Sequence, residues 1–388
     1  MNLSGNSSTY TVIQSFLLIA SLVTCSATKS AAQQNASNLE MSRSGLLRYN
    51  RAEGLFVGYG IRATPSQARH VSARFSGGYG IHNQSSRWDF GFEIDKPRYS
   101  LNGGIFDRTT SPNASIVTTA ENTLFALLFK GDYLDYYRTR NGFEIDFRIK
   151  AKRHLTLASY LSAFQYRNMP VDVNCTVFRN SDDFRPNPVI REGDAAVFKA
   201  GIVYNNRRKS PIFRNAWILN AFYERGFREF PYDGIAISIK RYQKTIFGKG
   251  AFVARGLIGS RESVDEQLLY DLGGISTLRG YRIKEYTGNR VLLLNVDYLF
   301  RGDVISKLSS RLGQFVELVA FVDAGWVNVA SRQTNLIDGF DSLRAGDIKS
   351  NVGGAVSLYR QLIRINVARR LDGDIDDWTF SARFRRQF

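Results

Sequence analysis

The strongest constraint on this chain is a two-residue alternation of side chains that places one apolar face opposite a face with polar residues, seen clearly between Arg290 and Phe300. The apolar side chains of this stretch share one face: Leu292, Leu294, Val296, Tyr298 and Phe300. Asn295 and Asp297 fall on the other face, because successive side chains of a β-strand point to opposite sides. One face suits lipid and the other suits water, but a soluble β-sandwich alternates in the same way. The number and length of the strands must therefore decide between the two folds.

The same alternation recurs along most of the chain and predicts sixteen strands. They are 54–63, 70–81, 87–95, 99–107, 123–130, 142–152, 155–166, 195–205, 216–227, 235–245, 250–262, 289–301, 314–327, 350–359, 361–371 and 378–388. Most are close to the ~9–11 residues that a tilted strand needs to cross the hydrocarbon layer. An even number of strands lets a barrel close, and closure leaves no unpaired strand edge in lipid. The expected fold is all-β: a 16-stranded antiparallel transmembrane β-barrel.

The order of the strands also orients the barrel. If the last strand ends in the periplasm, residues 263–288 and 328–349 form long extracellular loops, and residues 359–361 form a short periplasmic turn. The segment 263–288 is then the sixth extracellular loop. Residues 108–122 do not fit this scheme, because they form a long connection on the periplasmic side. A strand next to them is therefore expected to be misplaced.

The N-terminal residues differ in character from the rest of the chain. Residues 1–32 are expected to be an export signal, because the apolar segment from Val12 to Val23 is too short for a membrane helix and Ser30-Ala31-Ala32 suits signal peptidase. Residues 33–53 are then an N-terminal leader or a short amphipathic helix. The barrel is expected to occupy residues 54–388.

Residues able to carry out chemistry are few and scattered. Without the export signal, Cys175 is the only thiol, and the whole chain has three histidines. We therefore expect no disulfide, no metal site, no catalytic residue and no cofactor. The net charge of +17 is typical of a nucleic-acid binder, but the basic residues lack the clustering that such a protein needs. Arginines that line a wet lumen or meet lipid phosphates explain the charge better.

Two short motifs and the chain end stand out in the C-terminal third. Leu278-Arg279-Gly280-Tyr281 lies in the expected sixth loop, and Phe321-Val322-Asp323-Ala324-Gly325 lies on the thirteenth expected strand. The last strand carries aromatic residues on one face: Phe380, Phe384 and Phe388. In this order the three features resemble the BamA/TamA-type outer-membrane barrel superfamily (the bacterial surface antigen family), which includes insertases and two-partner secretion transporters. Residues 48–55 and 135–138 look like segments of its shorter members.

The resemblance implies specific roles for these residues. Arg279 would fold into the lumen with the sixth loop and meet Asp323, with Asp297 as a second lumen partner. Phe321 and Gly325 complete the motif on the strand that carries Asp323. Such a pairing is physically reasonable, because an arginine in a water-restricted lumen needs a carboxylate, and a charge-assisted hydrogen bond can hold a long loop in one place.

The resemblance is incomplete at two places. Phe380, Phe384 and Phe388 resemble the C-terminal signal that the barrel assembly machinery reads, but Arg386 occupies a position that is usually apolar. The periplasmic POTRA domains of the superfamily have no room before residue 54. We therefore expect a short member without POTRA domains, whose place separate periplasmic subunits would take.

The function implied by the resemblance is insertion or translocation of proteins at the outer membrane, with no enzymatic step. The expected partners are outer-membrane lipids and lipopolysaccharide, the barrel assembly machinery during biogenesis, and client proteins or periplasmic accessory subunits, but not nucleic acid. The alternative is a passive or lipid-handling pore with a basic lumen. A barrel phospholipase is a third hypothesis, for which no serine, histidine and acid align.

Overall fold

The computed structural model describes most of the chain between residues 39 and 384. The described residues are 39–42, 47–65, 68–112, 117–129, 131–171, 173, 176–177, 184–207, 215–245, 250–300, 315–332, 335–358, 362–372 and 378–384. Residues 1–32, expected to be an export signal, lie outside these ranges, as do Cys175 and Phe388.

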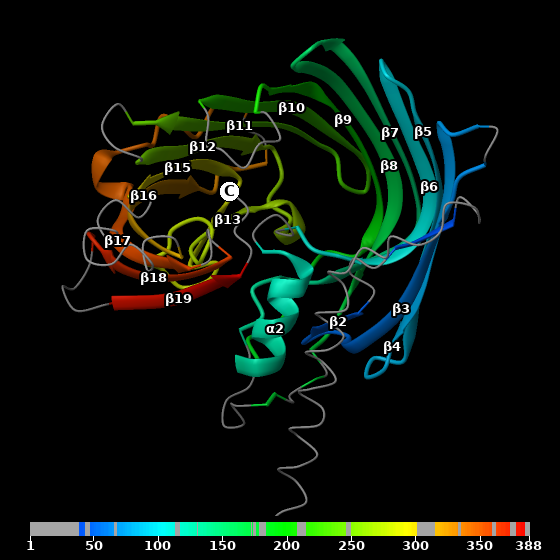
Figure 1. Cartoon of the computed structure of the whole chain (residues 1–388), viewed down its shortest axis with the longest axis horizontal. Helices are drawn as coiled ribbons and strands as arrows, with labels where there is room; N and C mark the ends of the chain where they lie inside the picture. The colour runs from blue at the N-terminus through cyan, green and yellow to red at the C-terminus, as the bar shows by residue number, and fades with distance from the viewer. Residues whose placement is uncertain are drawn as a thin grey trace, which may run out of the picture.

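The chain folds into a long meander of antiparallel strands that curves round into a barrel (Figure 1). The first strands are β1 (Leu39–Ser42), β2 (Leu47–Asn50), β3 (Gly54–Ala63), β4 (Val71–Gly80), β5 (Ser85–Asp95), β6 (Tyr99–Thr110), β7 (Tyr137–Lys152), β8 (Leu155–Asn168) and β9 (Gly193–Asn205). The barrel continues with β10 (Ala216–Arg228), β11 (Tyr232–Lys244), β12 (Ala251–Arg261), β15 (Arg290–Leu299), β16 (Val316–Asn328), β17 (Lys349–Leu358), β18 (Ile363–Arg370) and β19 (Trp378–Phe384). The remaining elements are helix α2 (Thr119–Phe129), the hairpin strands β13 (Tyr270–Leu272) and β14 (Tyr286–Gly288), and the 3₁₀ turns η1 (Glu266–Leu268) and η4 (Ala345–Asp347).

Each strand from β3 onward pairs with the next barrel strand along the chain, and β12 pairs with β15 because the β13–β14 hairpin leaves the wall. At the other edge of β3, both β1 and β2 pair with it, at residues 60–63 and 54–57 respectively. These two short strands share one position in the wall. The seventeen strands of the sheet therefore occupy sixteen positions, which confirms the expected 16-stranded antiparallel barrel.

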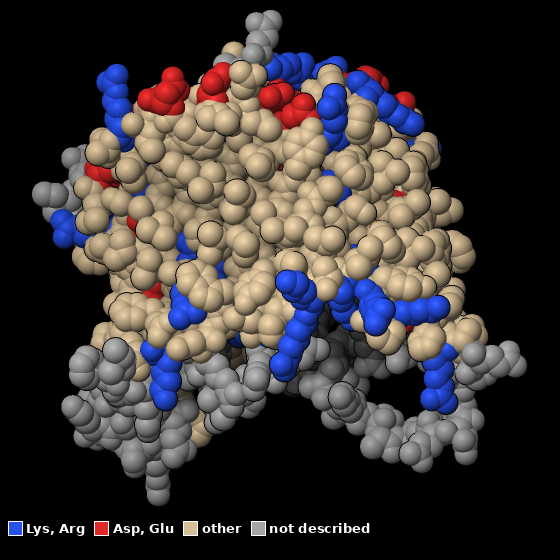
Figure 2. All heavy atoms as spheres, turned by 90° about the horizontal axis from the view of Figure 1, so that it is seen from above, with Lys and Arg blue, Asp and Glu red and all other residues tan. Residues whose placement is uncertain are grey.

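The strands present apolar side chains outward, as the alternation predicts. Phe90 on β5 is 52% exposed and Leu294 on β15 is 50% exposed, although both are large and apolar. One face of the molecule shows a broad uncharged band between two ends that carry the charged side chains (Figure 2). This arrangement suits a surface that lies in lipid. Among the described residues, no helix is both long and apolar enough to cross a bilayer.

The expected strand at 123–130 is wrong, because residues 119–129 form α2. The helix begins after Thr118, whose hydroxyl accepts a hydrogen bond from the backbone N–H of Glu121 at 3.2 Å. A threonine in this position satisfies one of the N–H groups that the first helical turn leaves without a partner. The apolar run Leu124-Phe125-Ala126-Leu127-Leu128-Phe129 has no period that separates a buried helix from a buried strand.

Before residue 54 the described residues include β1 and β2, and none of them forms the amphipathic helix that was one of the two expectations for this segment. β1 and β2 do not pair with β3 in one continuous register. Ser42 pairs with Gly60 and Leu47 pairs with Val57, so the segment between β1 and β2 is longer than the segment of β3 that lies opposite it. β1 and β2 together add one wall position to the expected strands, and the loss of 123–130 removes one, so the number of positions stays at sixteen. The connection between β6 and β7, which contains α2, then falls on the same side of the barrel as the sixth loop.

Candidate functional site: the sixth loop and the seam helix

The sixth loop, residues 262–289, leaves the wall after β12 and folds into the lumen. Its β13 and β14 strands pair with each other, and Leu278 is fully buried in a cluster with Leu272, Tyr281, Val291 and Leu293. Gly280 lies so close to β17 that a Cβ there would be 2.8 Å from the Cβ of Asn351. The loop is thus packed against the inner wall.

Arg279 makes the central contact between the loop and the wall. Its Nε donates to Asp323 Oδ2 at 2.8 Å, its Nη2 donates to Asp323 Oδ1 at 2.5 Å, and its backbone N–H donates to Asp323 Oδ2 at 3.1 Å. Nη2 also donates to Asp297 Oδ1 at 2.8 Å. Both acids expected to meet Arg279 are therefore at hydrogen-bonding distance from it, one on β16 and one on β15.

The other residues of the strand motif shape the surroundings of this pair. The guanidinium of Arg279 lies over the Phe321 ring, 3.7 Å from its centroid, where the ring face attracts a cation. A Cβ at Gly325 would lie 2.8 Å from Leu272 Cδ1, so any larger residue there would force the Leu272 side chain of the loop to shift. Each singled-out residue of the motif on β16 thus contacts the sixth loop directly.

Sequence reasoning missed three polar residues of this centre. Arg364 on β18 donates from Nη1 to Asp297 Oδ2 at 2.7 Å. Asn295 and Asn351 donate to the two oxygens of Asp323, each at 2.8 Å. We call Arg279, Asp297, Asp323 and Arg364 the loop-six anchor. Its two positive and two negative charges balance, as buried charges must.

The electrostatics of the anchor favour the charged form of its arginine. Arg279, on the loop, is only 3% exposed, and burial alone would lower its pKa. The carboxylates of Asp323 and Asp297 outweigh burial, so the pKa of Arg279 is raised. The guanidinium therefore stays charged, and separating it from the acids would leave buried charges unpaired.

Tyr281, the last residue of the loop motif, fixes the loop to the far strands of the wall. Its hydroxyl donates to the backbone oxygen of Ser350 at 3.0 Å and also bonds Asp372. The guanidinium of Arg370 lies 4.2 Å from the centroid of the Tyr281 ring. The loop is therefore held at two places, by Arg279 and by Tyr281.

The residues expected to form the C-terminal signal lie apart from the anchor. Phe380 points outward and is 73% exposed. The Phe384 ring instead packs against Phe125 of α2, with 5.5 Å between the ring centroids.

Helix α2 lies between β19 and β2, the last and first wall positions, and we call this place the seam (Figure 1). Glu121, almost fully buried, accepts hydrogen bonds from Arg383 Nε at 3.0 Å and from the backbone N–H of Phe384 at 2.8 Å. Thr123, half a turn further on, accepts the backbone N–H of Tyr49 at 3.1 Å. Side chains of one helix thus bind edge N–H groups of both the first and the last wall positions.

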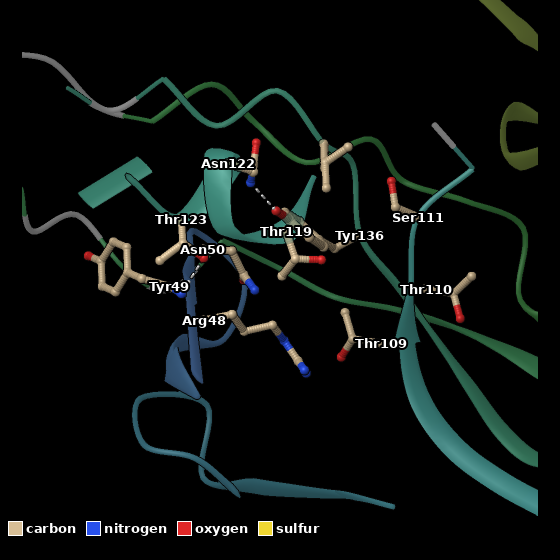
Figure 3. Close-up of a pocket in the computed structure, with 11 residues that line it drawn as sticks. Arg48, Tyr49, Asn50, Thr109, Thr110, Ser111, Thr119, Asn122, Thr123 and Tyr136 are labelled. Atoms are coloured by element: carbon tan, nitrogen blue, oxygen red, sulfur yellow. Dashed lines mark hydrogen bonds between the residues drawn. The ribbon is translucent and has the colours of Figure 1, made fainter. Parts of the chain in front are cut away.

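A cavity of about 140 Å³ separates α2 from the first strand and the end of β6 (Figure 3). The hydroxyl groups of Thr109, Thr110, Ser111 and Thr119 border it, together with Asn50. The helix is therefore incompletely packed on its lumen side. Such a contact is easier to separate than a close-packed one.

The two segments that resemble shorter superfamily members meet near α2. Arg51, fully buried, donates from Nη2 to Asp135 Oδ1 at 3.0 Å. Asp135 also pairs with Arg185 at 2.6 Å and with Lys284 of the sixth loop at 2.7 Å. Burial would raise the pKa of Asp135, but Arg185, Lys284 and Arg51 together lower it. One carboxylate thus ties four loops together at the mouth of the barrel.

The described residues contain no group of three or more histidine, cysteine, aspartate or glutamate side chains that could hold a metal ion. The fold and the site define a 16-stranded barrel of the outer-membrane type. Its sixth loop is anchored in the lumen, and a helix lies at its seam.

The likeness to one solved outer-membrane barrel, BamA, supports this fold. BamA from Haemophilus ducreyi lacking POTRA domains 1–3 superposes with a TM-score of 0.57 at 14% identity, covering 90% of this chain and 70% of that one. CdiB from Escherichia coli gives a TM-score of 0.48 at 12% identity, covering 91% of this chain and 63% of that one. Residues 25–215 match the family described as "Family of unknown function (DUF5686) C-terminal domain". No curated protein matches the sequence.

Proposed function

We propose that this protein inserts or translocates other polypeptides at the outer membrane, and that the seam between β19 and β2 is where they are handled. The observation that carries the proposal is the way α2 binds the seam. Backbone N–H groups at Phe384 and Tyr49 donate to side chains of the helix. A donor bound in this way is not bonded to a neighbouring strand at that position.

The chemistry of such a seam suits reversible opening. Strand edges carry backbone donors and acceptors that pair with any added strand, whatever its sequence. Here side chains of α2 occupy some of these donors. Displacing α2 would uncover strand edges at the rim of a barrel that otherwise has none, which supports work on other polypeptides.

The loop-six anchor has a different role in this proposal. It holds a long loop inside the lumen, and the Asp135 contacts tie that loop to its neighbours, so the wall next to the seam stays in register while the seam moves. This arrangement favours polypeptide handling over the alternative of a passive pore. Arginines of the lumen also have acidic partners: Arg108 pairs with Glu144 at 2.6 Å, and Arg138 pairs with Asp107 at 2.6 Å. These pairs argue against an open basic lumen.

The proposal involves no catalytic step and no cofactor. Its partners are outer-membrane lipids and lipopolysaccharide around the barrel, the barrel assembly machinery that inserts the chain itself, and client polypeptides. Likeness in fold to BamA supports this proposal through architecture alone, because the identity is 14%.

A reversible lock on the seam tests the proposal. In a chain with Cys25 and Cys175 replaced by serine, cysteines at Phe125 and Phe384 can be joined by a short bifunctional reagent that forms reducible disulfides to both thiols, which would link α2 to β19 because the two rings pack against each other. Cells that depend on this variant should lose specific outer-membrane proteins when the reagent is added, as depleted cells do, and regain them on reduction. The readout is the protein composition of purified outer membranes.

A matched control distinguishes seam locking from cross-linking in general. Phe252 and Tyr298 are paired on β12 and β15, far along the wall from the seam, with 4.8 Å between ring centroids. The same link between cysteines at these positions should have no effect. A locked seam that supports a normal membrane composition would refute the proposal, and steady anion-selective currents in planar bilayers would favour the pore.

A further inference from the structure

The end of the barrel opposite the sixth loop gathers every second connection of the meander. The connections between β3 and β4, β5 and β6, β7 and β8, β9 and β10, and β11 and β12 all lie there, because neighbouring strands run antiparallel. Backbone hydrogen bonds link neighbouring connections: Lys150 donates to Arg98 at 2.8 Å, and Asn205 donates to His154 at 2.9 Å. We call the described residues 64–65, 68–70, 95–98, 150–154, 205–207 and 244–245 the basic rim. The seam mechanism proposed above does not use it.

The basic rim carries a strong excess of positive charge. Its exposed lysines and arginines are Arg69, Lys96, Arg98, Lys150, Lys152, Arg153, Arg207 and Lys244. None of these eight side chains forms an ion pair with another described residue. Among the described residues of the rim, the one exposed acid is Asp95. A row of like charges without counter-charges attracts anions, so the rim favours an anionic partner.

The opposite end of the barrel is different. Figure 2 shows side chains of both signs at one end of the molecule and mainly lysine and arginine at the other. At the end of the sixth loop, Arg332 pairs with Asp265 at 2.5 Å, and Arg167 pairs with Glu192 at 3.0 Å. The excess at the basic rim is therefore not a simple consequence of a basic composition.

Aromatic side chains place the cations of this end at the surface of the lipid. Trp217, at the start of β10, is 45% exposed, and the guanidinium of Arg241 on β11 lies 4.7 Å from the centroid of its ring. The ammonium group of Lys96 lies 5.6 Å from the centroid of the Tyr99 ring. Tryptophan and tyrosine rings on the outside of a barrel collect at the level of the lipid headgroups. Cations beside such rings are at the depth of the lipid phosphates.

We propose that the basic rim binds the phosphate groups of anionic phospholipids in the leaflet at this end of the barrel. Ammonium and guanidinium groups are the usual partners of phosphate in proteins. An acidic protein would match the charge as well, but it would not account for the cations that lie over lipid-facing rings. The inference names a headgroup and the part of the barrel that takes it, and it does not depend on whether the seam opens.

The test uses Trp217 as a reporter in the full chain, with Trp88, Trp326 and Trp378 replaced by phenylalanine. The protein is reconstituted in vesicles of equal parts phosphatidylglycerol and phosphatidylcholine, in which one lipid or the other carries brominated acyl chains that quench tryptophan fluorescence. Quenching of Trp217 should be stronger when phosphatidylglycerol carries the bromine. Salt at about 1 M should weaken this preference, because the screening length is then about 3 Å.

Two paired substitutions show whether the rim itself selects the lipid. Removing one cation beside an anionic surface lowers the local preference about fivefold, so Arg241→Gln combined with Lys244→Gln should remove most of it. Arg225→Gln combined with Arg228→Gln is the matched control, because Arg225 lies eight residues from Trp217 along β10, about 26 Å away. The control should keep the preference.

Each variant is first shown to be folded by its heat-modifiable mobility on gels, and the salt dependence of the reporter chain needs no substitution in the rim. Equal quenching by the two brominated lipids overturns the proposal. So does a preference that survives both high salt and the loss of Arg241 and Lys244. Equal quenching together with an acidic protein that binds the reporter chain, but not the variant without these two cations, would assign the rim to a protein partner instead.

Discussion

Replacing Asp323 with alanine should release the sixth loop from the wall. Asp323 is fully buried and accepts five hydrogen bonds, three from Arg279 and one each from Asn295 and Asn351. Breaking a buried ion pair by removing one partner costs about 3–5 kcal/mol. Asp297 still holds Arg279 in the variant, so the lower part of that range applies. The docking equilibrium of the loop should shift roughly 10²- to 10³-fold toward the undocked form.

Hydrogen exchange at Tyr281 measures this shift, because its backbone N–H donates to Leu278 within the loop and keeps that acceptor in the variant, whereas the Arg279 N–H loses Asp323 itself. Exchange at Tyr281 should accelerate by the same roughly 10²- to 10³-fold, and trypsin should cleave after Lys284, which is nearly buried when the loop is docked. Asp347→Ala, an exposed change in the loop between β16 and β17, is the control and should alter neither readout. If the Tyr281 amide in Asp323→Ala stays as protected as in the unaltered protein, the anchor does not hold the loop.

Three further predictions concern neighbouring contacts. Glu121→Ala should weaken the docking of α2 by about 3 kcal/mol, and the Tyr49 amide, whose acceptor Thr123 on the helix is left in place, should then exchange faster; unchanged exchange would show that the carboxylate is not the contact that matters. Arg364→Met should lower the free energy of unfolding in lipid vesicles by about 3 kcal/mol, and a loss below about 0.5 kcal/mol would contradict its place in the anchor. Burial, with Asp135 and Glu266 nearby, raises the pKa of Asp271 to about 6. A raised acid pKa favours the folded state below its ordinary value of 3.8, and this contribution is lost as the pH rises to about 6. The free energy of unfolding of Asp271→Asn should therefore rise by about 3 kcal/mol between pH 4 and pH 7 relative to that of the unaltered protein. A difference between the two proteins that does not depend on pH would contradict this.

Most of the wall could be predicted because alternation is a local signal. The expected strand 54–63 matches β3 at both ends, and the strands on either side of the sixth loop match within two residues. Outward Leu294 and inward Asp297 also follow directly from parity. Because side chains alternate between the two faces of a strand, a correctly assigned strand also assigns the face of every residue on it.

Helix α2 could have been found from a different signal. Thr118 and Glu121 have the spacing of a capping box, a threonine followed three residues later by a glutamate just before an apolar run. The hydroxyl of Thr118 does cap the helix, but the glutamate side chain turns away to Arg383. The helical start was therefore readable from the sequence, whereas the partner of Glu121 was not, because 262 residues separate the two side chains.

The loop-six anchor was predictable only in part for a related reason. Arg279, Asp323 and Asp297 lie in or opposite recognisable motifs. Arg364 carries no motif, and its only signal is alternation with apolar neighbours on a late strand, a pattern that several arginines of this basic chain share. Which of them reaches Asp297 depends on the curvature of the wall, because curvature brings β18 within reach of β15 across the lumen, and no local pattern encodes it.

Arg383 connects the two parts of the site. From β19 it donates through Nε to Glu121 on the seam helix and through Nη1 to the Ser276 hydroxyl on the sixth loop, at 2.7 Å. The Thr379 hydroxyl, on the same strand, donates to the backbone oxygen of Gly280 beside the anchor at 3.0 Å. Moving α2 away therefore removes the contact of Arg383 with Glu121, and releasing the loop removes its contact with Ser276. Because both contacts share one guanidinium, the stability of the seam and the docking of the sixth loop depend on each other.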